Sequence, residues 1–124
     1  MVKWAFNPDK EVHFDTSVKA AVSRYYPLFD GMVKAGGWMV EDDSATIADV
    51  LVAEMLHEYG LMHEERGVAD PVDDYPKLKG LIGRVVEMEG VKAYLSSNRR
   101  FPFPAEGQVC DEYVRNVNTV LGRI

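Results

Sequence analysis

Apolar residues recur at intervals of three or four positions along almost the whole chain, which is the spacing of one face of an α-helix. Between residues 8 and 35 the pattern predicts one long helix, with Pro8 in its first turn and the glycine pair 36–37 at its end. The apolar stripe of this helix consists of Val18, Val22, Tyr25, Phe29 and Met32. Pro27 lies inside the helix and costs about 3 kcal/mol unless the backbone bends, so we expect a kink there.

A second helix is predicted from Thr46 to about Tyr59, with a further turn left open. Its residues leave little polar surface, so we expect it to be central and buried. Thr46 and Asp49 form a Thr-x-x-Asp variant of the capping box, in which each side chain satisfies the backbone N–H of the other. A catalytic Asp49 would need a second titratable group at suitable spacing, and the sequence offers none. The pair is therefore predicted to be structural.

The remainder of the chain continues the helical pattern. Residues 67–74 form an acidic loop, and a third helix begins at Pro76, with Asp74 or Tyr75 as its cap. The stripe of this helix is Leu78, Leu81, Ile82, Val85 and Met88. A short fourth helix over residues 91–97 is expected to turn Val91, Tyr94 and Leu95 inward, and the last segment carries Tyr113, Val114, Val117 and Leu121 at near-helical spacing. No alternating strand pattern is convincing, so the predicted class is all-α.

Composition limits the kind of protein further. The chain has 124 residues, 47% of them hydrophobic, which suits a single domain over residues 1–124. The net charge of −6 argues against binding to nucleic acid or to an anionic membrane. One cysteine cannot form an intramolecular disulfide, and the N-terminal residues lack the apolar run of a signal peptide. We expect a cytosolic protein.

Candidate metal ligands and nucleophiles are weak. His57 and His63 lie six positions apart, roughly 240° around a helix, so they cannot share a metal ion, and a solvated helix end is the expected setting. His13 is expected at the surface. Cys110 has no histidine partner and is expected to be an inert, partly buried thiol. The pair Arg99-Arg100 follows the fourth helix, where positive charge interacts favourably with the helix dipole. An anion-binding site at this pair is the alternative. We predict no catalytic residue, no metal site and no cofactor.

An aromatic and proline-rich tail follows the fourth helix. The sequence FPFP places Phe101 and Phe103 on an extended segment, with Tyr113 beyond it. These aromatic side chains either line an apolar pocket for a substrate or hold the tail against the core. The residue pattern leaves both interpretations open.

Two segments resemble a known family. GGWMVEDDSATIADVLVAE is similar to the Gly-Gly, aromatic-Leu-Val-Gly-Asp and Ser/Thr-x-Ala-Asp signature of the C-terminal helical domain of cytosolic glutathione transferases. DYPKLKGLIGRVVEMEGVKAYLSS is similar to the Tyr/Phe-Pro-x-Leu helix and the short Val-x-x-Tyr-Leu helix that follow in that family. The resemblance covers roughly residues 8 to 100 and is closest to sigma-like members. Glu41 stands where glycine is usual, and Ala45 is a weak partner for a hydrophobic staple to Val50.

The resemblance implies that the enzyme's functions are divided between two domains, of which this chain contains only one. In the family a thioredoxin-like N-terminal domain binds most of the glutathione and supplies the residue that activates its thiol, and nothing in this sequence resembles that domain. Residues 1–7 resemble a remnant of the first helix of the C-terminal domain. Trp4 and Phe6 would then be apolar residues without the helix in which they packed. Residues 8–100 are the family-like core, and residues 101–124 form a tail and helix. The resemblance implies Phe101, Phe103 and Tyr113 as lining of the electrophile pocket.

The expected protein is therefore a fragment, or a separately encoded portion, of a glutathione transferase. Its parent would be a homodimer with glutathione as co-substrate, and the chain alone would be inactive. The alternative is a non-catalytic interaction module of the same shape, as in translation elongation factor 1 gamma or aminoacyl-tRNA synthetase complexes. A thioredoxin-like segment encoded upstream of Met1 would favour the enzyme, whereas a synthetase or elongation-factor domain would favour the module.

Overall fold

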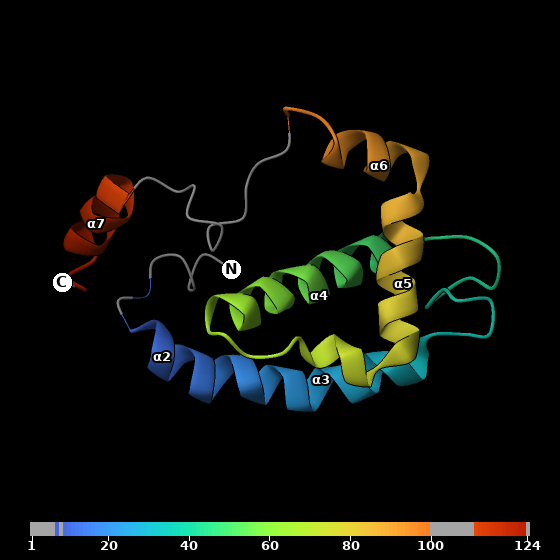
Figure 1. Cartoon of the computed structure of the whole chain (residues 1–124), viewed down its shortest axis with the longest axis horizontal. Helices are drawn as coiled ribbons and strands as arrows, with labels where there is room; N and C mark the ends of the chain where they lie inside the picture. Colours follow the sequence, from blue (N-terminus) through green and yellow to red (C-terminus); the bar gives the residue numbers. More distant parts are fainter. Residues whose placement is uncertain (1–6, 8, 100–110, 124) are drawn as a thin grey trace.

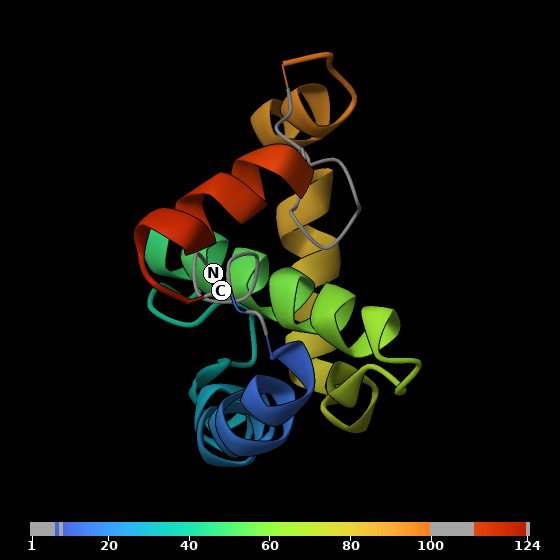
Figure 2. The ribbon, with the colours of Figure 1, turned by 90° about the vertical axis from the view of Figure 1, so that its left-hand side faces the viewer.

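The fold is all-α in every part of the chain that the computed structural model describes, which is residues 7, 9–99 and 111–123. The elements are α2 (Lys10–His13), the π-helix η1 (Phe14–Val18), α3 (Lys19–Met32), α4 (Ile47–Glu65), the 3-10 helix η2 (Pro71–Asp74), α5 (Pro76–Glu87), α6 (Glu89–Leu95) and α7 (Asp111–Val120). Figure 1 shows α4 above α3, with α5 running across one end of both and α6 at the far end of α5. In the turned view of Figure 2, α3 is seen nearly end-on while α4 still extends across the picture, so α3 and α4 cross obliquely.

The first predicted helix exists, but its ends and its buried face differ from the prediction. The helical segments α2, η1 and α3 follow one another without a gap from Lys10 to Met32, so the predicted end at residues 36–37 is wrong. Asp9 caps the start by accepting the N–H of Val12 at 3.0 Å. The helix continues through Pro27. An irregular turn that the sequence did not predict lies in η1, which buries Phe14 and Val18.

Tyr26, and not Tyr25, is the core residue of α3. Tyr26 is 1% exposed and makes edge-on contacts with the rings of Tyr59 and Tyr75, at centroid distances of 6.5 and 5.7 Å. Tyr25 and Met32, which were predicted to belong to the core stripe, are 39% and 47% exposed. The reason is that α4 and α5 pack against the face of α3 that carries Tyr26 and not against the face that carries Tyr25.

The second helix is longer than predicted and is not buried on all sides. Thr46 is the cap of α4, as predicted, and the helix extends to Glu65. One buried face follows the spacing four, three, four, three through Asp49, Ala53, Leu56, Gly60 and His63, and Met62 is also buried, in a second cluster with Phe14 and Val18. Ile47 and Leu51, on another face, are 73% and 58% exposed, so the prediction of a fully buried helix is wrong. No described element covers that face.

The third helix is the hub of the fold. α5 begins at Pro76 with Tyr75 as its cap and contacts α3, α4 and α6. Leu78, Leu81 and Val85 of the predicted stripe are buried, and they complete the main core with Tyr26, Val33, Met39, Ala53, Leu56 and Val72. α6 packs mainly against α5, which is why Tyr94 and Leu95 are about 40% exposed and not inward as predicted. Figure 1 places α7 at the opposite end of the molecule from α5.

Candidate functional site

Asp49 lies fully buried at the start of α4, and its two carboxylate oxygens serve two different segments. Oδ2 accepts the Thr46 N–H at 2.7 Å and the Thr46 hydroxyl at 2.9 Å, and both legs of the capping box are present. Oδ1 accepts the N–H of Met39, ten residues earlier in the chain, at 2.7 Å. The same carboxylate therefore caps the helix and fixes the loop that leads to it.

The protonation of Asp49 agrees with a structural role. Desolvation by the surrounding protein raises the pKa of Asp49, but the hydrogen bonds from Thr46 and Met39 outweigh it and hold the pKa below its ordinary value. A general base works best with a pKa near the operating pH, and Asp49 is shifted away from that range. Its oxygens face fixed donors of the chain itself, which leaves no room for a substrate proton.

The histidines do not form a metal site. His63 is buried, and its Nδ1–H donates to the Tyr59 carbonyl at 2.6 Å, while its ring packs edge-on against Phe14 at a centroid distance of 4.8 Å. The prediction that His63 lies at a solvated helix end is therefore wrong, since η1 covers it. His57 is exposed, and His13 is half-buried. Among residues 7, 9–99 and 111–123 no group of three or more metal-ligating side chains comes together.

The predicted pocket residues are only partly placed. Phe101, Phe103, Arg100 and Cys110, like Trp4 and Phe6, lie outside the described residues. Tyr113, in the first turns of α7, is 59% exposed. Arg99 lies beyond the end of α6 and is exposed.

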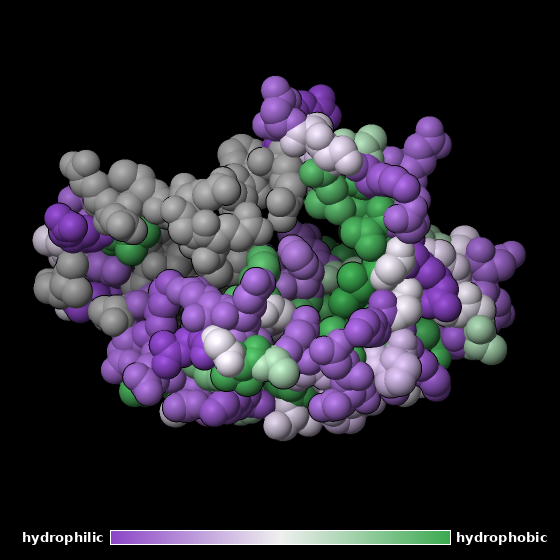
Figure 3. All heavy atoms as spheres, viewed as in Figure 1, coloured by the Kyte–Doolittle hydropathy of each residue, from purple (hydrophilic) through white to green (hydrophobic). Residues whose placement is uncertain are grey.

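Several large apolar side chains are exposed on helix faces that the sequence pattern did not identify. Tyr25, Leu28 and Met32 follow one another at helical spacing on α3 and are all exposed. On α4 the exposed pair is Ile47 and Leu51. Figure 3 shows hydrophobic atoms gathered in a hollow between α4, α5 and α6. The α4 sequence carries apolar residues on more than one face, so its pattern did not show which face would be covered.

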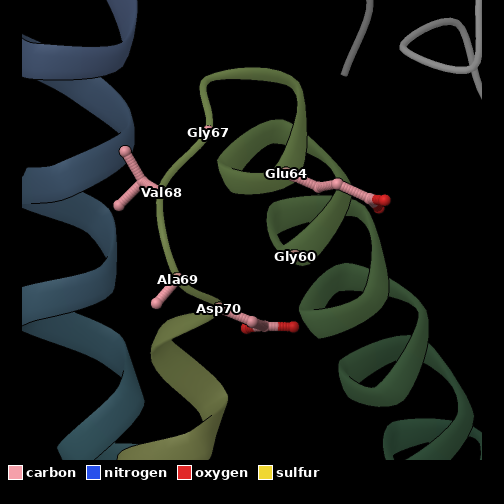
Figure 4. Close-up of a pocket in the computed structure, with 6 residues that line it drawn as sticks. All are labelled: Gly60, Glu64, Gly67, Val68, Ala69 and Asp70. Carbon is pink, nitrogen blue, oxygen red and sulfur yellow. The ribbon is translucent and has the colours of Figure 1, made fainter.

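A second depression, of about 480 Å³, lies beside the loop that follows α4, and it is lined by Gly60, Glu64, Gly67, Val68, Ala69 and Asp70 (Figure 4). In Figure 4 the Asp70 carboxylate reaches toward Gly60, while Val68 and Ala69 turn away from α4. Asp70 accepts the Val72 N–H at 3.0 Å and so caps η2. No nucleophile is paired with a base among these six lining residues. The depression therefore offers no catalytic pair, and the role of Asp70 in it is to cap η2.

Within the described part of the chain, no helix has both the length and the apolar character needed to cross a membrane. Searches of curated proteins and of solved structures gave no significant match.

The chain matches the family model described as "Glutathione S-transferase, C-terminal domain" over residues 1–98. The matched region includes the capped helix α4, the hub helix α5 and the short helix α6. It also includes both segments whose sequences resemble that family. With most of its length matched and an all-α fold, the chain belongs to the family of glutathione transferase C-terminal domains.

Proposed function

We propose that this chain is the helical part of a cytosolic, sigma-like glutathione transferase. In the complete enzyme the glutathione thiolate attacks an electrophile, and this domain contributes the scaffold and part of the apolar pocket for that electrophile. The family match over residues 1–98 carries the proposal. Thiol activation belongs to a thioredoxin-like N-terminal domain, which is the proposed partner, and the proposed assembly is a homodimer.

The hollow between α4, α5 and α6 supports the pocket role. Its surface is apolar in Figure 3, as expected for a site that receives an apolar electrophile. Apolar side chains on these three helices, such as Met55, Ile82 and Val91, are packed against the core but are only partly buried. We propose that Phe101 and Phe103 complete this pocket, whereas Tyr113 belongs to α7, at the opposite end of the molecule from α5, and lies apart from it.

The exposed stripes on α3 and α4 support the partner role. A stripe of three large apolar side chains on α3 and a further pair on α4 leave surface that an additional helix or domain stabilises by covering it. In the complete enzyme, we propose, the first helix of the helical domain and the thioredoxin-like domain supply that cover. Burial of one such side chain contributes about 1.5–3 kcal/mol, so covering several gives a stable contact.

We propose that the isolated chain is inactive, because the residue that activates the thiol belongs to the separate N-terminal domain. The Thr46 hydroxyl donates to the Asp49 carboxylate at 2.9 Å, but that carboxylate also accepts two backbone N–H groups, so the pair serves the helix cap. Asp49, the most buried acid, is committed to the cap and the loop. The interaction-module alternative has no specific observation among the described residues in its favour.

Binding of a glutathione conjugate with an aromatic group to the isolated chain tests the pocket role. In heteronuclear NMR spectra of the full 124-residue chain, S-(2,4-dinitrophenyl)glutathione should shift the methyl signals of Ile82 and Val91 and saturate. The double substitution F101A/F103A should weaken this binding at least tenfold. The matched control L28A removes an exposed side chain on α3 and should change the affinity less than twofold. Shifts that are confined to α3, or equal in all three proteins, would contradict the pocket assignment.

A further inference from the structure

A positively charged pocket of about 510 Å³ lies between the loop that follows α3 and one side of α5. Three cationic side chains line it, and they come from two segments that are far apart in the sequence: Lys34 follows α3, and Lys77 and Arg84 belong to α5. The other lining residues are Val33, Ala35, Gly37, Pro76 and Gly80. No acidic residue is among these eight, although the whole chain carries a net charge of −6.

Two glycines leave the space that the Arg84 side chain occupies in this pocket. Gly37 has a φ of +91°, and a Cβ at this position would come within 2.3 Å of the Arg84 guanidinium carbon. A Cβ on Gly80 would lie 3.0 Å from Arg84 Nη1. The guanidinium therefore lies against two backbone segments that only glycine leaves open, and Nη1 is 3.5 Å from the Gly37 carbonyl. The loop is itself fixed, because the Lys34 N–H donates to the Trp38 carbonyl at 2.8 Å and the Gly37 N–H donates to the Lys34 carbonyl at 2.9 Å.

The positive charge in this pocket is poorly compensated. Lys34 Nζ lies 3.6 Å from Asp42 Oδ1, but the Asp42 side chain is 88% exposed, so this ion pair is weak. Among the described residues, no carboxylate oxygen lies within 4.0 Å of Lys77 or Arg84. Three cations that line one pocket repel each other, and an anion placed between them relieves that repulsion.

We propose that this pocket binds the phosphate group of a small molecule. A phosphate dianion accepts hydrogen bonds from several directions, so the planar fork of Arg84 can pair with two of its oxygens while Lys34 and Lys77 act as point charges. A volume of about 510 Å³ holds more than a bare ion and leaves room for a small organic group. Figure 1 shows that α6 lies at the opposite end of α5, so this pocket is separate from the hollow proposed for the electrophile.

Titration of the full chain with sodium phosphate, at constant ionic strength in chloride, tests the proposal. Amide signals of Gly37, Lys77 and Gly80 should shift and saturate. Lys77→Gln and Arg84→Gln should each weaken the binding about tenfold, the loss expected for one charged hydrogen bond. Lys19→Gln removes a cation on the outer face of α3 that pairs with Asp15, and should change the affinity less than twofold.

A second titration distinguishes an organic phosphate from the free ion. Glucose 6-phosphate should bind at least as tightly as inorganic phosphate, and glucose should not bind. The Gly37→Ala variant, which displaces Arg84, should weaken both phosphates together. Linear shifts without saturation, equal affinities in the Lys77, Arg84 and Lys19 variants, or failure of glucose 6-phosphate to bind would each overturn the proposal. Because neither titration involves glutathione, a failure here leaves the proposed function untouched.

Discussion

The carboxylate of Asp49 accepts the backbone N–H of Met39 at 2.7 Å while its other oxygen closes the cap on Thr46. One buried side chain thus connects the first turn of α4 to the loop after α3. The loop lines the positively charged pocket through Lys34 and Gly37, and the helix forms one wall of the apolar hollow. This carboxylate therefore stabilises the connection between α3 and α4 and belongs to neither proposed site.

Loss of Asp49 should cost more than loss of Thr46. Thr46→Ala removes one member of the cap and should lower the free energy of unfolding by about 1 kcal/mol. Asp49→Ala also leaves the buried Met39 N–H without its acceptor, which adds about 1–3 kcal/mol. Urea unfolding of both variants measures the difference. Equal losses of unfolding free energy would show that the Met39 contact adds nothing. In a reconstituted enzyme, we predict that the turnover of folded Asp49 variants stays near the wild-type value.

Gly60→Ala should destabilise the chain although alanine favours helices. A Cβ at Gly60 would lie 2.5 Å from Asp70 Oδ2, and Asp70 is held in place as the cap of η2. Overpacking of this kind costs about 1–3 kcal/mol. Gly83→Ala in α5 is the matched control, because a Cβ there meets nothing within 4 Å and should add about 0.4–1 kcal/mol. Thermal unfolding should therefore shift in opposite directions, and a stabilised Gly60→Ala variant would refute the close contact.

Glu58 should make the stability depend on pH between about 4.5 and about 7. Desolvation and the neighbouring Glu54 raise the pKa of Glu58 from 4.5 to about 7, so the folded state favours the protonated acid. Its contribution to stability is therefore largest at low pH and is lost as pH rises through this window. Glu58→Gln should raise the free energy of unfolding at pH 8 and change it little at pH 4.5. Glu64→Gln, at an exposed position on the same helix, should show no such contrast in denaturant titrations.

Leu51 should be dispensable for folding of the isolated chain. Its side chain is 58% exposed, so Leu51→Glu should change the free energy of unfolding by less than about 0.5 kcal/mol. Leu56→Ala, one turn further along and 0% exposed, should cost about 2–5 kcal/mol. Chemical denaturation compares the two. A large loss in Leu51→Glu would mean that this face is already covered in solution and would remove one support for a docking partner.

Helix positions and the fold class could be predicted because local signals decide them. Thr46 before an apolar run and Pro76 after an acidic loop set the starts of α4 and α5 without help from tertiary contacts. Which face of a helix is covered depends on neighbours that the sequence does not place. The prediction was therefore wrong for Tyr25 and for Ile47, both of which are exposed.

Contacts between segments that are distant in the sequence could not be predicted either. His63 is buried because η1 brings Phe14 against it, and nothing near His63 in the sequence announces this. The pocket between Lys34 and Arg84 depends on a loop held by Gly37 at positive φ. The glycine pair could be predicted as a turn, but the cation that lies over it could not.

Glutathione conjugation by the isolated 124-residue chain tests the central claim most directly. The measurement is the rate of conjugation with 1-chloro-2,4-dinitrobenzene at saturating glutathione, with folding verified by circular dichroism. If the chain supplies scaffold and pocket while a separate domain activates the thiol, the rate should equal the uncatalysed background. A rate comparable to that of a complete transferase, from folded protein, would contradict the account.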